Sequence, residues 1–291
     1  MKISYYFYDS ISIIMSECFS NIFIENGQVC DRTDFDISKI FEDEVVYEVI
    51  RIRKGIPIFL SDHFERLGKS AAYTGNKLLL DFDEIRIHIL KLINLSDIEE
   101  GNIKVSLKYS PAYTGYLIYY IDAQYPGPEL YKSGVKGILY YAERRNPVAK
   151  VFNHKLRSSI YSKLIQANAY EALLVNRGGC ITEGSRSNVF FIRDKILYTA
   201  PDQYVLGGIT RKKILKICEV EDFDLEFKCL HVDELNTIDS AFMTGTSPNV
   251  LSFNIIEDYI FNVNNELLQV ITEKYMLLID AYMKEFVMKY K

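Results

Sequence analysis

Residues 181–190 read ITEGSRSNVF: a glutamate precedes a glycine, small polar residues follow, and an apolar strand begins at the end. Glu183 is therefore expected in a turn that leads into a strand. A carboxylate at such a turn can keep a pyridinium nitrogen protonated, which makes a pyridine-based cofactor a better electron sink. Taken alone, the stretch is better explained by a turn whose carboxylate faces water.

A lysine lies upstream among apolar neighbours, in residues 149–153, AKVFN. Because burial among Ala, Val and Phe side chains destabilises the charged form, the pKa of Lys150 is expected to fall and its neutral amine to become available. A neutral amine can form a Schiff base with a carbonyl group. The alternative is an ordinary surface lysine at a strand edge, as most lysines are.

Two glycine-containing turns could hold a phosphate group. Residues 206–211, LGGITR, are a glycine turn that opens a helix, and the backbone N–H groups at a helix start suit an anion together with the Thr210 hydroxyl. Residues 243–247, MTGTS, form a second small, hydroxyl-rich loop after a strand. Each signal is weak by itself, because glycine turns before helices are common.

Bulk properties limit the classes of protein that remain. The chain has 291 residues, enough for two domains, and its net charge of -5 is spread along the sequence, which gives no reason to expect a nucleic-acid partner. The five cysteines and four histidines are scattered, and no pair has metal-ligand spacing. Neither a leader pattern nor a membrane-length apolar run is visible. We expect a reduced, soluble, cytoplasmic protein with no metal site and no membrane partner.

The clearest break in the sequence is QYPGP at residues 124–128. Prolines and a glycine this close together cannot extend a helix or a central strand, so they predict a linker. We expect an N-terminal domain at residues 1–123, a linker at 124–130 and a C-terminal domain at 131–291. The N-terminal part mixes helix and strand patterns, whereas the C-terminal part is mostly strands with helices between them.

Within the N-terminal part, the β-branched run at residues 45–52 predicts a buried strand. Ser61 or Asp62 is expected to cap a helix that ends at Gly75. A second helix is expected to begin near Asp81.

Five motifs, in order along the chain, resemble those of the class IV pyridoxal-phosphate enzymes. They are VYEVIR at 46–51, GIPIFLSDHFERL at 55–67, YEALL at 170–174, TEGSRSNVF at 182–190 and GITR at 208–211. The family contains branched-chain and D-amino acid aminotransferases and aminodeoxychorismate lyase. The resemblance implies pyridoxal 5'-phosphate as cofactor and an α+β, two-domain fold of type IV. The N-terminal α/β domain would be the smaller, and the C-terminal domain would be mostly β with helices.

The resemblance covers residues 29–256 and selects one of two candidate lysines for the cofactor. In the family an asparagine follows the lysine by three residues, as Asn153 follows Lys150. Lys150 also precedes Tyr170 at the ungapped family spacing, whereas Lys155 would need a deletion. Lys150 is therefore the expected attachment point.

The resemblance also implies which residues bind the cofactor phosphate. Arg66 would contact it through the paired donors of its guanidinium group. Ile209 and Thr210 would bind it through backbone and hydroxyl groups. Thr246, with Gly245 beside it, would add a further contact.

Further roles implied by the resemblance concern the cofactor ring and the substrate. Glu183 would pair with the pyridine nitrogen, and Arg144 or Arg145 would reach the phenolic oxygen. Tyr47 and Arg51 alternate on one face of their strand, so both are candidates for the substrate side of the site. For Arg51, a salt bridge on the sheet is an equally good interpretation.

Three stretches depart from the family pattern. FEDEV at residues 41–45 replaces a glycine-rich lead into the strand, and residues 108–115, KYSPAYTG, lack the arginine–histidine loop of D-amino acid aminotransferases. His154 and GTSPN at residues 245–249 stand where branched-chain enzymes carry a tyrosine and a GTAAE-like loop. D-amino acid specificity is therefore disfavoured, branched-chain specificity is weakened, and the substrate remains open.

The leading hypothesis is an aminotransferase that moves an amino group between a small amino acid and a 2-oxo acid. Lys150 would hold the cofactor as an internal aldimine and then move the proton as a base. One alternative is 4-amino-4-deoxychorismate lyase, which releases pyruvate on the same scaffold. Another is a non-catalytic homologue that binds pyridoxal phosphate. The resemblance further implies a homodimer.

Overall fold

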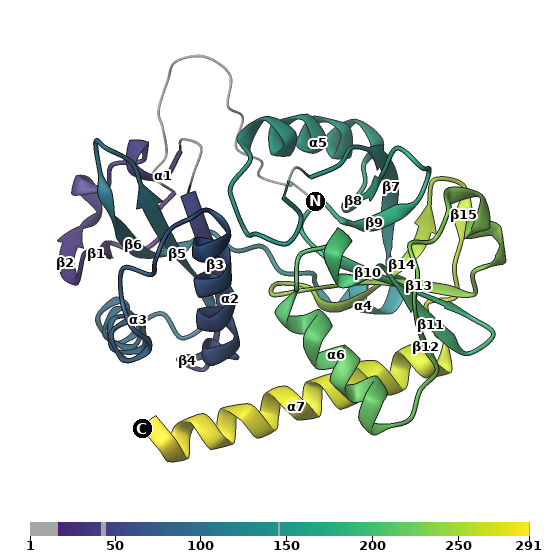
Figure 1. Ribbon diagram of the computed structural model, residues 1–291. Helices are drawn as coiled ribbons and strands as arrows, with labels where there is room; N and C mark the ends of the chain where they lie inside the picture. Colours follow the sequence, from purple (N-terminus) through teal and green to yellow (C-terminus); the bar gives the residue numbers. More distant parts are fainter. Residues whose placement is uncertain (1–16, 42–44, 145, 291) are drawn as a thin grey trace.

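Two β-sheets form the framework of the protein and lie next to each other in the computed structural model (Figure 1). The structure describes residues 17–41, 45–144 and 146–290. Residues 42–44, within the departure from the family's glycine-rich lead, lie outside these ranges. In the described residues one sheet has six strands and the other nine, and both carry helices. The expected α+β fold with two domains is thus confirmed.

The N-terminal sheet is antiparallel at each of its described strand pairs. Its strand order is β2-β1-β6-β5-β3-β4. The strands are β1 (Ile22–Glu25), β2 (Gln28–Asp31), β3 (Val45–Arg53), β4 (Ile56–Pro57), β5 (Gly101–Tyr109) and β6 (Thr114–Ile121). The helices of this domain are α1 (Ser38–Phe41), α2 (Leu60–Tyr73) and α3 (Phe82–Ser96).

The two faces of β3 have different surroundings. Val46, Ile50 and Ile52 alternate along the strand and are buried in one cluster with Leu60 and Leu67 of α2. The residues between them point to the opposite face, toward the space between the two domains. β3 therefore separates the N-terminal core from that space.

The C-terminal sheet combines parallel and antiparallel pairs in the order β12-β11-β10-β13-β14-β7-β8-β9, with β15 paired to β14. Its central strands are β14 (Asn249–Ile256), β7 (Val135–Tyr141) and β8 (Glu171–Val175), which pair in parallel. The remaining strands are β9 (Ile181–Gly184), β10 (Asn188–Arg193), β11 (Ile196–Thr199), β12 (Leu225–Phe227), β13 (Ser240–Gly245) and β15 (Tyr259–Ile260).

Four helices accompany this sheet: α4 (Pro128–Ser133), α5 (His154–Ala167), α6 (Ile209–Val220) and α7 (Glu266–Tyr290). α5 connects the parallel strands β7 and β8 and packs on both, as a crossover helix does. None of the helices in the described part of the chain is both long and apolar enough to cross a membrane.

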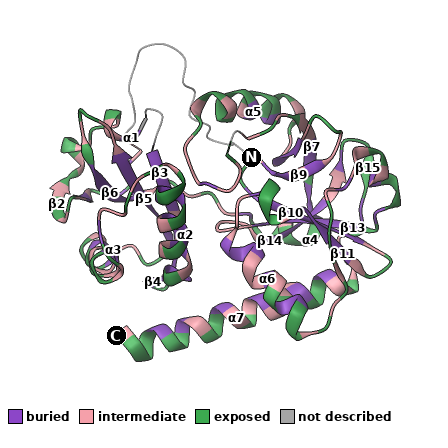
Figure 2. Cartoon of the chain, in the orientation of Figure 1, coloured by how far each residue is buried: buried purple, intermediate pink, exposed green. Residues whose placement is uncertain are grey.

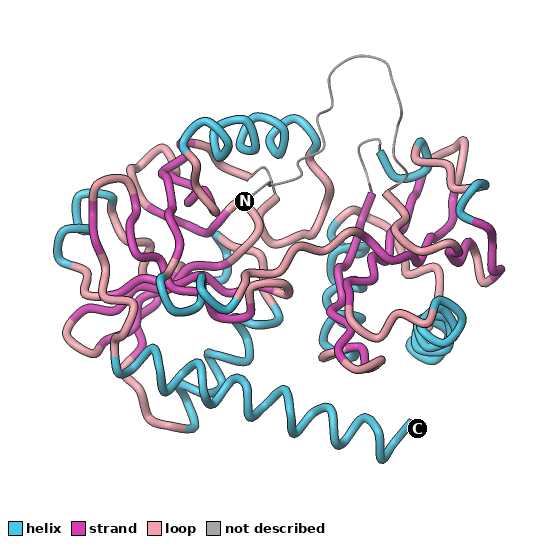
Figure 3. The backbone as a smooth tube through the Cα atoms, turned by 180° about the vertical axis from the view of Figure 1, so that it is seen from behind, coloured by secondary structure: helices cyan, strands magenta, loops and turns pink. Residues whose placement is uncertain are grey.

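The long helix α7 joins the two domains. Figures 1 and 3 show it running from the C-terminal domain along the underside of the N-terminal domain. Near its start it packs on α6, and farther along the Tyr282 hydroxyl accepts a 3.0 Å hydrogen bond from Leu60 N. Residues of both domains and of α7 belong to one buried cluster. Figure 2 shows the consequence, with buried positions concentrated in the strands and on the inner side of α7.

A second junction brings the segment before α5 against β3. Val46 and Val151 form an antiparallel bridge, Tyr47 N donates to Lys150 O at 3.2 Å, and Phe152 N donates to Val45 O at 3.1 Å. These backbone bonds fix Lys150 beside the free face of β3.

Most of the expected N-terminal elements are found, with one difference. β3 covers the predicted strand, and Asp81 caps α3 by accepting from Glu84 N. The helix expected after Ser61 begins earlier, at Leu60, and its cap is Phe59 in a left-handed conformation with no side-chain cap bond. The capping prediction was therefore wrong.

Candidate active site

A small cavity of about 90 Å³ lies between the free face of β3 and the C-terminal domain. It brings together residues that are far apart in the sequence. Those predicted from the sequence are Tyr47, Arg66, Arg144, Lys150, Glu183, Ile209, Thr210, Gly245 and Thr246. Arg51 lies elsewhere, and Arg145 is outside the described residues.

Lys150 projects into this cavity from the segment before α5. Its backbone N donates to Ser70 Oγ at 3.1 Å, and its Nζ lies 4.9 Å from the centre of the Tyr47 ring. Burial lowers the pKa of Lys150, and the positive charge of Arg66 lowers it further, although Tyr47 and Glu48 act in the opposite direction. The expected shift toward a neutral amine is present.

Glu183 is the next-to-last residue of β9 and is buried at the cavity wall. Arg144 donates to its Oε1 at 3.0 Å, and Leu206 N donates to its Oε2 at 3.0 Å. Burial raises the pKa of the Glu183 carboxyl, and Arg144 offsets this only in part. The interpretation of Glu183 as a carboxylate facing water is therefore excluded.

A buried ion cluster lies below the cavity, and the sequence analysis missed two of its members. Glu48, on the core face of β3, accepts two 2.7 Å bonds from Arg66 and a 2.7 Å contact from His63 Nδ1. Burial alone would raise the pKa of Glu48, but Arg66 and His63 outweigh it and lower the pKa far below its usual range. Arg66 also donates to Gly207 O at 3.2 Å, so its guanidinium reaches the turn before α6.

That turn forms an open cradle. α6 begins at Ile209 after Gly208, which provides no side-chain cap. A Cβ at Gly208 would collide with the side-chain oxygen of Asn188, so any other residue would displace that side chain. The Thr244 hydroxyl, which also lines the cavity, is buried and has no hydrogen-bond partner among the described residues. The cradle thus offers unpaired donors on two sides.

Tyr47 and Arg157 form a polar pair on the other side of Lys150. Arg157, in the first turn of α5, donates to the Tyr47 hydroxyl at 2.7 Å. Burial would raise the pKa of Tyr47, but the charges of Arg157, Lys150 and Arg144 outweigh it and lower the pKa to about 7. Tyr47 was expected from the sequence but Arg157 was not, because no local pattern links a helix residue to a strand so far away in the chain.

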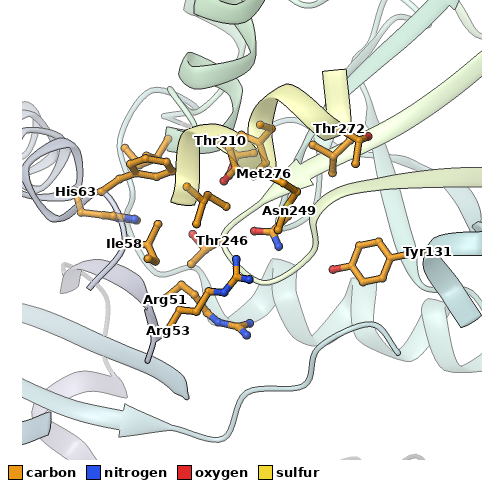
Figure 4. Close-up of a pocket in the computed structure, with 15 residues that line it drawn as sticks. Arg51, Arg53, Ile58, His63, Tyr131, Thr210, Thr246, Asn249, Thr272 and Met276 are labelled. Carbon is orange, nitrogen blue, oxygen red and sulfur yellow. The ribbon is translucent and has the colours of Figure 1, made fainter. Parts of the chain in front are cut away.

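A larger cavity of about 400 Å³ adjoins the first and shares Ile209, Thr210 and Thr246 with it. Figure 4 shows Arg51 and Arg53 in its wall, close to Thr246 and Asn249. Arg51 stacks on the Tyr125 ring at 3.3 Å and reaches Glu100 at 3.4 Å. Arg51 lines a cavity, as a residue on the substrate side would, and it also forms an ion pair, as the alternative interpretation expects.

No cluster of three or more His, Cys, Asp or Glu side chains that could hold a metal ion is found in residues 17–41, 45–144 and 146–290. The groups that converge on the smaller cavity are instead a lysine amine whose pKa is lowered by burial, a buried carboxylate, paired arginines and a helix start. This set suits an anionic organic molecule with a ring nitrogen.

Comparison with known proteins matches residues 45–256 to the family model described as amino-transferase class IV. The chain is 31% identical to D-alanine aminotransferase of Bacillus licheniformis over 80% of its own length and 87% of that protein. It is 27% identical to aminodeoxychorismate lyase of Bacillus subtilis, over 73% and 78% of the two chains.

Among solved structures, the fold is similar to a branched-chain amino acid aminotransferase of T.th. complexed with N-(5'-phosphopyridoxyl)-L-glutamate. The TM-score is 0.80 at 19% identity, and the match covers 91% of this chain and 96% of the other. At this identity the likeness concerns the fold alone.

Proposed function

The chain belongs to the class IV aminotransferase family, whose enzymes depend on pyridoxal phosphate, and we propose that it moves an amino group between a small amino acid and a 2-oxo acid with Lys150 as its cofactor-bearing residue. The observation that carries this proposal is the convergence of Lys150, Glu183 and the α6 cradle on one cavity. Each of the three signals was weak in the sequence alone. Because all three line the same cavity, they support one another as parts of a single cofactor site.

The cradle fits the phosphate of the cofactor. The first N–H groups of α6 lack a side-chain cap, and the buried Thr244 hydroxyl lacks a partner among described residues. An anion placed there would receive the helix-start donors and the hydroxyls of Thr210 and Thr246. Arg66 would add positive charge from below, held in place by Glu48.

The ring end of the cofactor fits the opposite wall. Bound pyridoxal phosphate supplies an aldehyde carbon that exchanges amino groups and a pyridine ring that takes up electrons from the substrate Cα. Glu183 would hold a proton on the ring nitrogen, because a buried carboxylate favours a positive partner. Arg144 orients that carboxylate at 3.0 Å.

Lys150 would then act as the proton carrier. Burial lowers the pKa of Lys150 and so favours the neutral Nζ, the form that can take the proton from Cα of the amino acid. The backbone bonds to Tyr47 and Ser70 fix the segment that bears it. A fixed base close to the reacting carbon is what this step requires.

A spectral titration of the purified holoenzyme with a panel of L- and D-amino acids tests the proposal. D-Alanine and branched-chain L-amino acids come first, because the relatives bear those names. We expect the absorbance of the lysine-bound cofactor to convert to that of its amino form with at least one donor, and 2-oxo acid to reverse the change. No conversion with any donor would contradict an aminotransferase.

A lyase is the second candidate, favoured by the similarity to aminodeoxychorismate lyase. The protein would be incubated with aminodeoxychorismate without a 2-oxo acid acceptor, and pyruvate would be measured. The aminotransferase proposal predicts no catalytic release of pyruvate. Sustained release of pyruvate would contradict the aminotransferase proposal and support the lyase.

Two finer points complete the proposal. We propose a homodimer, and light scattering after size-exclusion chromatography should give twice the chain mass. We also propose a cytoplasmic location, which is supported by five cysteines that are all free thiols.

A further inference from the structure

Arg157 differs from the two carboxylate-paired arginines that line the smaller cavity. Arg66 is paired with Glu48, and Arg144 is paired with Glu183. Arg157 donates instead to a phenol, the hydroxyl of Tyr47, and has no carboxylate within salt-bridge distance among the residues that the structure describes. Its partner at the cavity is therefore a phenol, whose pKa the Arg157 charge helps to lower to about 7, and not a carboxylate.

Two other cations lie near the cavity, and each is engaged elsewhere. Lys104, on β5, lies 5.4 Å from the Tyr47 ring centre but is paired with Glu17 at 2.7 Å. Arg186 also lines the cavity without a carboxylate partner among the described residues, but its guanidinium is held by the backbone carbonyl of Tyr170 at 3.3 Å. Arg157 is thus the cavity cation best placed to accept an anionic ligand.

The position of Arg157 relative to the reacting amine fits a small molecule. Both cations lie near the Tyr47 ring, whose centre is 4.9 Å from Lys150 Nζ and 5.5 Å from the Arg157 guanidinium carbon. The guanidinium also lies over the Phe152 ring at 5.1 Å, which limits its freedom of movement. A molecule whose reacting carbon lies at Lys150 can therefore extend one functional group to Arg157.

The chemistry of the substrate supplies such a group. Both amino acids and 2-oxo acids carry a carboxylate on the carbon next to the reacting nitrogen or oxygen. A guanidinium binds a carboxylate through two parallel N–H donors, and only one nitrogen of Arg157 is used by Tyr47. The other donors remain for the ligand.

We propose that Arg157 binds the carboxylate of the amino acid and of the 2-oxo acid, with the Tyr47 hydroxyl beside it, and so determines that the substrate is a carboxylate-bearing amine or ketone. This role rests on the proposed aminotransferase function and specifies which residue binds the substrate carboxylate. Arg157 is an exposed residue that also lines the cavity, so an anion can reach it from solvent.

Binding to the holoenzyme tests the proposal without turnover. Propionate and its neutral analogue propionamide are titrated against the wild type, Arg157→Gln and Arg157→Lys, with the cofactor absorbance as the signal. We expect Arg157→Gln to weaken propionate binding roughly 10- to 100-fold, in the range of a lost hydrogen-bonded charge pair. Propionamide binding should be unchanged, and Arg157→Lys should restore part of the affinity for propionate.

Lys163→Gln provides a matched control, because it removes an exposed cation from the same helix outside the cavity. It should bind propionate as the wild type does. Unchanged cofactor absorbance in all variants would show that the site is intact.

Kinetics give a second, independent measurement. Arg157→Gln should raise KM for the amino acid and the 2-oxo acid by a similar factor, with a smaller change in kcat. Equal loss for propionate and propionamide, or unchanged propionate affinity, would overturn the carboxylate role. Because the binding measurement needs no reaction, a wild type that binds propionate through Arg157 but does not transaminate would contradict only the proposed function.

Discussion

Glu48 is the residue on which the lower wall of the site depends. Its carboxylate is 1% exposed and holds both Arg66 and His63. A buried ion pair contributes little over an apolar replacement, but the loss of one partner leaves a buried charge uncompensated. The cluster therefore makes the position of Arg66 sensitive to a change on the core side of β3, away from the cavity itself.

Glu48→Gln should lower the free energy of unfolding by about 3 kcal/mol or more, because Arg66 would keep its charge without a buried carboxylate. The folded-state pKa of Glu48 is depressed, so its ionised form stabilises the protein fully above the ordinary glutamate pKa of about 4.3 and progressively less below it. Urea unfolding at several pH values measures the effect. The difference between wild type and variant should shrink as the pH falls below that value.

Glu65→Gln is the control, since Glu65 forms an exposed ion pair with Lys69 and both residues belong to α2. It should change stability by less than about 0.5 kcal/mol. Equal stability of Glu48→Gln and wild type at neutral pH would show that the buried cluster does not have the role described.

At the scale of elements, α5 and the segment before it determine the geometry of the site. Asn153 caps the helix by accepting from Leu156 N at 3.1 Å, and the residues just before it bridge to β3. The same short stretch therefore positions Lys150 on one side of the cap and Arg157 on the other. A single cap links the two functional side chains.

Asn153→Ala should destabilise the protein by about 1 kcal/mol, because the first turn of α5 loses its cap. Asn153→Asp, which retains an accepting oxygen, should remain within a few tenths of a kcal/mol of the wild type. Thermal and urea unfolding of both variants provide the measurement. Equal losses in the two variants would mean that the side chain acts through something other than capping.

The sequence predicted these elements unevenly, for physical reasons. The start of α3 near Asp81 was predicted correctly, and the capping box that fixes it is local, with Glu84 three residues later. The predicted start of α2 was wrong. Phe59, the residue before the helix, adopts φ 53° and its side chain is buried in the core. Packing of this side chain outweighs the preference for a polar cap. Short-range patterns predict local bonds, and they miss geometry imposed by tertiary packing.

The candidate site shows the same limit. Lys150, Glu183 and Thr210 could be named from motifs, since each lies in a stretch that resembles the family. Glu48 and Arg157 act through partners that lie distant in the sequence, so no spacing indicated them. Contacts between residues distant in the sequence depend on the tertiary fold, so local sequence patterns do not predict them.

At the scale of the whole molecule, the two domains share one core. The buried cluster that contains Ile50 and Leu60 also contains Phe242 of the C-terminal sheet and Phe286 of α7. β6 ends at Ile121 and β7 begins at Val135, with α4 between them. We therefore propose that the chain division at residues 124–130 marks a change of sheet, while the shared core makes the domains unfold together.

Phe286→Ala should lower stability by about 3 kcal/mol or more, because a buried aromatic ring is removed from the far end of α7. Its neighbour Val287 is 42% exposed, so Val287→Ala should change little. Urea unfolding followed by circular dichroism and by tyrosine fluorescence gives both values. If Phe286→Ala had the same free energy of unfolding as the wild type, α7 would not be the connection that stabilises the two domains.

The attachment of pyridoxal phosphate to Lys150 underlies the whole account, and one measurement tests it most directly. The holoenzyme is treated with borohydride, which fixes the cofactor on its lysine, and the digested protein is examined by mass spectrometry. We expect the added mass on the peptide at Lys150, lost in Lys150→Ala and retained in Lys155→Ala. A label on Lys155, or a label that persists in Lys150→Ala, would contradict the assignment.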